Sequence, residues 1–177
     1  MLALAVSGCS ANQSGYQALL QSRYDDAGQA YESCLADACS DLRSRVRYAF
    51  VLYKTQQYQQ ALDLLDALKA HPDVAEFAFY WSGLVHLVVG DRHQAILDWR
   101  QCEPDAFEVR KAVYTALWAV ENSNDSDLAS VAQSVDVSVQ AAYGLYLSRV
   151  KHDPELPAAY SDAGLNRLSS LPSPYIP

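Results

Sequence analysis

The segment Tyr58–Leu68, with the sequence YQQALDLLDAL, decides the fold class of this 177-residue chain. Its residues Ala61, Leu62, Leu65 and Leu68 recur every three or four positions, so they form one apolar stripe on an α-helix. Turn signals rich in Pro, Asp, Asn and Gly separate this segment from similar stretches at residues 45–54, 77–89, 94–102, 109–121 and 139–150. Alternating apolar patterns are short throughout, so we expect an all-α fold.

A second pattern repeats along the chain. Ala27, Ala61 and Ala95 lie 34 residues apart, and Ala129 continues the series. A small residue stands twelve positions before each of the first three alanines and a large one four positions after, which gives the pairs Gly15 and Tyr31, Ala49 and Leu65, and Gly83 and Trp99. Small residues are needed where two helices cross at about 8–10 Å. A lone helix pair cannot bury its apolar face, so we expect at least three stacked pairs.

This pattern resembles the tetratricopeptide repeat, a 34-residue helix pair with the motif aromatic-x₂-L-G-x₂-Y, then A-x₃-F, then P. The third repeat matches best, with Phe79, Gly83, Ala95, Trp99 and Pro104 at motif positions. The resemblance is strong for residues 15–104 and weaker up to about residue 135.

The resemblance implies a right-handed superhelical solenoid of antiparallel helix pairs over residues 9–137. Residues 138–171 would form a capping helix pair, and residues 172–177 a proline-rich tail. Arrays of this family are non-catalytic scaffolds that hold a protein or peptide in a concave groove. Nothing in the resemblance calls for a cofactor, and we expect none.

In this family the first helix of each pair lines the groove. The 34-residue register therefore assigns to the groove Arg43, Phe50, Tyr53, Lys54, Phe77, Tyr80, Leu84, Lys111, Tyr114 and Trp118. Aromatic anchors with a few cations are what a peptide groove needs, and Tyr53, Tyr80, Tyr114 and Trp118 are the preferred candidates. The alternative is that several of these residues pack between repeats.

The N-terminal residues 1–10, MLALAVSGCS, are apolar and close on small residues, as a secretory signal does. Residues 6–9 resemble the bacterial lipobox, which implies that residues 1–8 are a signal segment and that Cys9 is acylated. Ser10 after the cysteine then points to the outer membrane, with the protein facing the periplasm. No Lys or Arg precedes the run, and the alternative is a cytoplasmic adaptor whose residues 1–20 form the first helix.

Export would place the other cysteines in an oxidising compartment. Cys34 and Cys39 can form a disulfide if the chain turns between them, because five residues within one helix would hold their Cα atoms too far apart. Cys102 is then a buried apolar residue.

Composition and motifs argue against other functions. The net charge of −8 disfavours a nucleic-acid partner, since such proteins concentrate Lys and Arg on one face. The sequence lacks a Cys-x-x-Cys or His-x-x-x-His pair, a glycine-rich phosphate loop and a Gly-x-Ser-x-Gly motif. His86 falls at an inward-facing position and is expected in the core. We therefore expect no metal site, no catalytic residues and no small-molecule substrate.

Overall fold

The computed structural model describes residues 4–36 and 41–151, with the backbone alone for residues 4–10 and 150–151. All regular secondary structure in these ranges is helical, which confirms the all-α prediction. Contacts divide the chain into two compact units, Met1–Trp81 and Ser82–Pro177.

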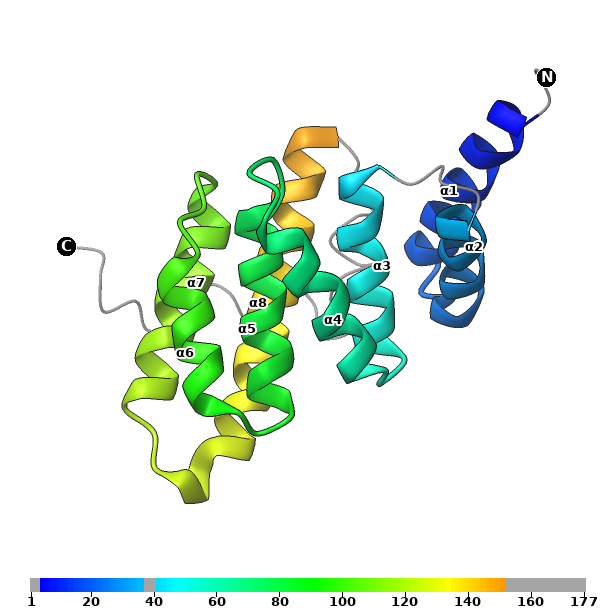
Figure 1. The fold of residues 1–177 in the computed structure, drawn as a ribbon. Coiled ribbons are helices and arrows are strands. Elements are labelled where there is room, and N and C mark those ends of the chain that lie inside the picture. Colours follow the sequence, from blue (N-terminus) through cyan, green and yellow to red (C-terminus); the bar gives the residue numbers. More distant parts are fainter. Residues whose placement is uncertain (1–3, 37–40, 152–177) are drawn as a thin grey trace. The chain divides into compact units, whose positions relative to one another are not determined.

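The first unit contains four helices and the start of a fifth: α1 (Leu4–Leu20), α2 (Tyr24–Ala36), α3 (Leu42–Lys54), α4 (Tyr58–Lys69) and α5 (Ala75–Val88). Helices that follow one another from α1 to α4 pack together (Figure 1). Asp41 begins α3 as an N-cap, because its carboxylate accepts the backbone N–H of Ser44 at 2.7 Å.

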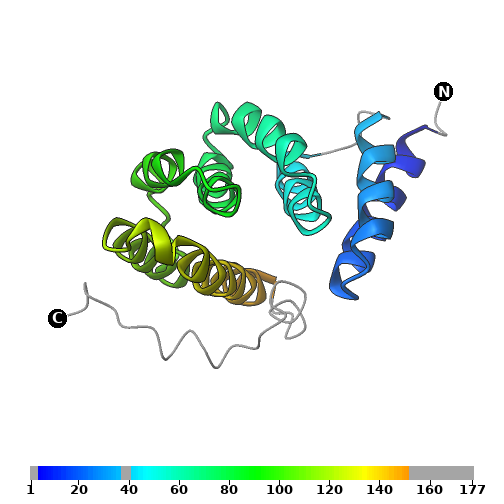
Figure 2. The same cartoon turned by 90° about the horizontal axis from the view of Figure 1, so that it is seen from below.

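The second unit holds the rest of α5, then α6 (Arg92–Gln101), α7 (Phe107–Glu121), the 3₁₀ turn η1 (Asp125–Asp127) and α8 (Leu128–Lys151). Helix α7 packs against both α6 and α8, and Figure 2 shows α8 beside α7. Helix α8 runs without interruption across the boundary predicted at residues 137 and 138, because no Gly or Pro stands near that boundary to end it. Residues 152–171 of the predicted capping pair lie outside the described residues.

Three of the helix ends share one backbone geometry. Ser22, Gln56 and Gly90 have φ values of 54°, 60° and 88°, in the left-handed region. In each turn the N–H of the next residue donates to the carbonyl oxygen five positions earlier: Arg23 to Ala18, Gln57 to Leu52, and Asp91 to His86, at 2.8–2.9 Å. This is the Schellman end of a helix, which glycine adopts most easily. Gly90 could be recognised from sequence, whereas Ser22 and Gln56 could not.

The small and large residues noted in the sequence meet inside two helix pairs. A Cβ placed on Gly15 of α1 would lie 3.1 Å from two atoms of the Tyr31 ring on α2, and one on Gly83 of α5 would lie 2.6 Å from two atoms of the Trp99 ring on α6. Both rings are 1% exposed. The absent side chains therefore let each helix approach an aromatic ring on its neighbour.

Three of the four alanines of the 34-residue series are buried, and the fourth is exposed. Ala27, Ala61 and Ala95 are fully buried, each the fourth residue of its helix. Ala129 is exposed, because α8 begins at Leu128 and places this alanine in the first turn.

A buried cation lies inside the first unit. The Arg47 guanidinium is stacked 4.8 Å from the centroid of the Tyr16 ring, and Arg47 is 9% exposed. Burial raises the pKa of Tyr31 to about 12, although the positive charge of Arg47 acts to lower it.

This pKa predicts an alkaline stability loss. The pKa of Tyr31 is higher in the folded chain than the unfolded value near 10, so its contribution to stability is complete below pH 10 and is lost as the pH rises toward 12. The loss attributable to Tyr31 is about 2–3 kcal/mol. Urea unfolding of wild type and of Tyr31→Phe between pH 8 and pH 12 gives the free energy of unfolding of each protein at each pH. Above pH 10 this free energy should fall more steeply with pH for wild type than for Tyr31→Phe. Parallel slopes would contradict the assignment.

Candidate binding sites

The groove residues predicted from the repeat register divide into buried and accessible positions. Five of them are at most 8% exposed and belong to the core: Phe50, Tyr53, Phe77, Tyr80 and Leu84. Phe50 packs against Trp81 with ring centroids 4.9 Å apart, and against Tyr53 at 6.4 Å. These residues stabilise the helices and do not face solvent, which is the packing alternative that the sequence left open.

Two predicted groove residues on α3 remain accessible. Arg43 is exposed, and Lys54 is partly exposed with its Nζ 5.2 Å from the centroid of the Tyr24 ring. Lys54 therefore contacts an aromatic ring of its own chain.

The three predicted residues on α7 share one accessible face with a fourth that the register did not include. Phe107, Tyr114 and Trp118 are 61%, 47% and 40% exposed, and Lys111 lies between them. Positions 107, 111, 114 and 118 follow the i, i+4, i+7, i+11 spacing of a single helix face. We call these four residues the α7 face. Monomeric proteins seldom leave such aromatic residues together in solvent without a binding role.

Arginine contacts hold both ends of α7. At its C-terminal end, Arg92 of α6 donates to the carbonyl oxygens of Val120 and Ser123 and pairs with Asp125. Near its N-terminal end, Arg149 of α8 forms an ion pair with Glu108. A helix fixed in this way presents its side chains in a preorganised arrangement, which lowers the entropy lost on binding.

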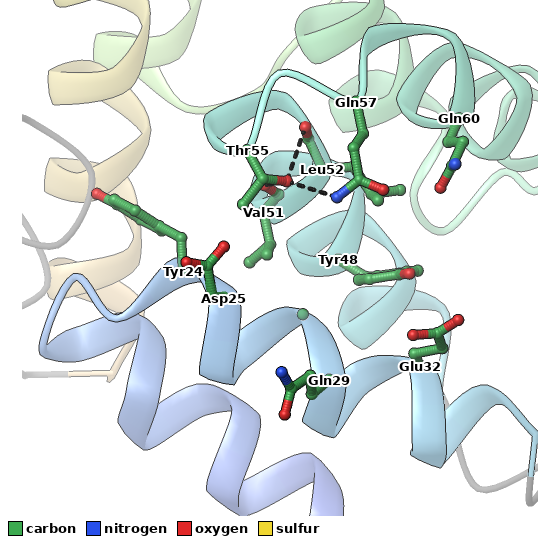
Figure 3. Close-up of a pocket in the computed structure, with 11 residues that line it drawn as sticks. Tyr24, Asp25, Gln29, Glu32, Tyr48, Val51, Leu52, Thr55, Gln57 and Gln60 are labelled. Carbon is green, nitrogen blue, oxygen red and sulfur yellow. Dashed lines mark hydrogen bonds between the residues drawn. The ribbon is translucent and has the colours of Figure 1, made fainter.

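A polar cavity of about 490 Å³ lies between α2 and α3 (Figure 3), and no pattern in the sequence predicts it. Asp25, Gln29 and Glu32 line it from α2, and Tyr48 and Val51 line it from α3. Gln57, which donates to the Thr55 hydroxyl at 2.9 Å, and Gln60 of α4 complete one side. We call this space the α2/α3 cavity.

One end of the α2/α3 cavity carries a perturbed tyrosine. Burial raises the pKa of Tyr48, and the negative charge of Glu32 raises it further. Figure 3 shows Glu32 and Tyr48 together at one end, with Asp25 at the other. Tyr48 thus keeps its proton, and its ring lies beside a carboxylate.

Ser82, His86 and Asp98 come together between α5 and α6. The Ser82 hydroxyl donates directly to Asp98, and Nε2 of His86 lies 3.7 Å from the same carboxylate oxygen. In a hydrolase triad the hydroxyl must donate to the imidazole, which then acts as the base. Here the serine proton points to the aspartate, and Ser82 and Asp98 are buried. This cluster is therefore a buried polar contact between two helices, with His86 partly buried beside it.

Among the cysteines whose side chains the structure describes, Cys34 is disulfide-bonded and Cys102 is buried. The side chains of Cys9 and Cys39 lie outside the described residues. The predicted Cys34–Cys39 disulfide and the predicted acylation of Cys9 both stay predictions.

The described residues contain neither a candidate membrane-spanning helix nor a candidate metal site. No helix there is long and apolar enough to span a membrane, and no group of three or more His, Cys, Asp or Glu side chains is arranged to hold a metal ion. In comparisons with known proteins, no family model, no curated protein and no solved structure matches this chain.

Proposed function

We propose that the chain is a tetratricopeptide-like scaffold that binds a protein partner through the α7 face. In this proposal the scaffold is a lipoprotein, anchored through Cys9 to the outer membrane and facing the periplasm. It carries no catalytic residues, and its partner belongs to an envelope assembly.

Backbone geometry supports the repeat. The left-handed residues Ser22, Gln56 and Gly90 stand 34 residues apart, each with the same hydrogen bond across its turn. Helices α2, α4 and α6 begin at the same interval, at Tyr24, Tyr58 and Arg92. A turn type that recurs at the spacing of the buried alanines favours three copies of one helix-pair unit.

The observation that carries the binding proposal is the exposure of aromatic residues on α7. Tryptophan and tyrosine supply much of the binding energy of protein interfaces, and Lys111 among them favours a partner segment that combines apolar side chains with a carboxylate. The same residue types elsewhere in the register, such as Phe50 and Tyr80, are buried. Among the aromatic residues of the predicted groove, those on the α7 face are therefore the ones we propose for contact with a partner.

Site-specific photo-crosslinking tests this face. A photo-reactive residue at position 114 should capture one partner in intact cells, and that partner is then purified. Trp118→Ala should weaken its binding by about 30-fold, the loss of a hot-spot residue worth about 2 kcal/mol. The matched control is Leu97→Ala on α6, which removes an apolar side chain 37% exposed outside the α7 face. Equal affinity of the two variants would contradict the proposal.

The proposed lipid anchor on Cys9 also predicts which cysteine pairs with Cys34. Acylation consumes the thiol of Cys9, so under this proposal Cys39 is the partner that we expect for the disulfide-bonded Cys34. Mass spectrometry of the protein extracted from membranes should show an acylated Cys9 and a peptide that joins Cys34 to Cys39. A disulfide between Cys9 and Cys34 would exclude the anchor. Reduced cysteines throughout would favour the cytoplasmic adaptor, in which α1 is simply the first helix.

A further inference from the structure

Gly28 is the unusual residue of the α2/α3 cavity. It lies inside helix α2, where glycine is less stable than alanine by about 1 kcal/mol. Gly15 and Gly83 are explained by the aromatic rings that fill the space of their missing Cβ atoms. A Cβ on Gly28 would meet only Val51 Cγ1 at 3.5 Å, an ordinary contact. Helix packing therefore does not require this glycine, but a side chain much longer than that of alanine would project into the cavity, which Gly28 lines.

The two charged residues that line the cavity, Asp25 and Glu32, are both acidic. Asp25 and Glu32 stand seven residues apart on α2, about 10 Å along the helix axis. In the part of the chain that the structure describes, neither carboxylate forms an ion pair, whereas the neighbouring Asp26 pairs with Arg23. Lys54 of α3 stacks on Tyr24, which lines the cavity at the Asp25 end. The Glu32 end thus combines a carboxylate, the Tyr48 ring and the neutral amide of Gln60.

We propose that the α2/α3 cavity binds an alkylammonium group, seated between the Glu32 carboxylate and the Tyr48 ring. A carboxylate beside an aromatic ring attracts such a cation through ion pairing and cation–π contact. Cation–π contacts of this kind already occur within the chain. Lys54 stacks on Tyr24, Lys69 on Phe79 and Arg47 on Tyr16. The amides of Gln29, Gln57 and Gln60 can hydrogen-bond to polar groups along the remainder of the ligand.

The same chemistry can come from a free polyamine or from a lysine side chain of a protein. Isothermal titration of the full chain with spermidine, and with the capped tripeptide Gly-Lys-Gly, distinguishes the two sources. We expect saturable 1:1 binding of at least one probe, and the tighter probe identifies the source. The capped tripeptide Gly-norleucine-Gly, which lacks the ammonium group, should not bind. Absence of saturable binding by both cationic probes would overturn the proposal.

Two pairs of variants test whether binding occurs at this site. Glu32→Gln should weaken binding by about tenfold, the effect of one charge-assisted hydrogen bond. Asp63→Asn is its control, because Asp63 is exposed on α4, lies outside the cavity lining and changes the net charge equally. Gly28→Met should weaken binding strongly by placing a long side chain in the cavity beside Glu32, whereas Gly28→Ala should preserve it. Equal weakening by Glu32→Gln and Asp63→Asn, or full binding by a folded Gly28→Met variant, would show attraction by net charge alone. The site is independent of the α7 face, so either proposal can fail without the other.

Discussion

Gly83→Ala is expected to destabilise the protein by about 3 kcal/mol or more, although it adds a single methyl group. The new Cβ would lie 2.6 Å from two ring atoms of Trp99, a separation at which one of the two helices must move. Trp99 is 1% exposed and its indole is rigid, so it cannot turn away as a flexible side chain would. Overpacking of a core costs 1–3 kcal/mol when side chains can adjust and more when the backbone has to shift. The midpoint of urea unfolding measures the effect.

Two other glycines serve as matched controls for Gly83→Ala. At Gly15 the nearest Tyr31 atoms lie at 3.1 Å, so Gly15→Ala should cost less, about 1 kcal/mol. At Gly28 the new Cβ meets Val51 at 3.5 Å, and Gly28→Ala should stabilise the chain by up to about 1 kcal/mol. Adding Trp99→Leu to Gly83→Ala should restore part of the loss. Similar unfolding midpoints for all three alanine variants would contradict the packing described for Gly83.

Asp98→Ala is the second substitution with a large expected effect, about 3 kcal/mol of destabilisation. Asp98 is 4% exposed and accepts the hydroxyl of Ser82, which is fully buried. Removal of the carboxylate leaves that hydroxyl without its acceptor and opens a cavity, and each change costs 1–3 kcal/mol. Thermal unfolding followed by circular dichroism measures the loss.

Asp98→Asn separates the contribution of the Ser82–Asp98 hydrogen bond to stability from that of the negative charge. The amide oxygen can still accept the Ser82 hydroxyl and fills the same volume, so this variant should lose about half as much stability as Asp98→Ala. It loses the negative charge that lies 3.7 Å from Nε2 of His86. If both variants were as stable as wild type, the Ser82–Asp98 contact would not contribute to the packing of α5 against α6.

The packing inside the helix pairs follows from the sequence because it depends on residue size. The contact between Gly83 and Trp99 can be predicted, since one residue is small and the other large at the spacing where paired helices face each other. The buried positions of Ala27, Ala61 and Ala95 follow from the same rule. The exposure of Ala129 does not follow from this rule, because α8 begins at Leu128 and its register is not set by the repeat.

The candidate binding residues are harder to predict, because aromatic side chains serve cores and interfaces equally well. Tyr80 and Tyr114 occupy the same position of the 34-residue register, yet Tyr80 is fully buried and Tyr114 is 47% exposed. The α2/α3 cavity had no sequence signal, since it depends on how two helices approach and on the side chain that Gly28 lacks. Exposure and cavity shape arise from tertiary packing, which a repeat pattern does not specify.

Fluorescence quenching of Trp118 tests the binding proposal most directly. Trp81 and Trp99 are each 1% exposed, so acrylamide should quench Trp118 far more than the other two tryptophans. The quenchable emission should be absent from Trp118→Phe. We predict that the partner captured from position 114, added at saturation, will protect this emission from acrylamide and shift it to shorter wavelength. Unchanged quenching of Trp118 in the saturated complex would contradict the assignment of the α7 face as the binding surface.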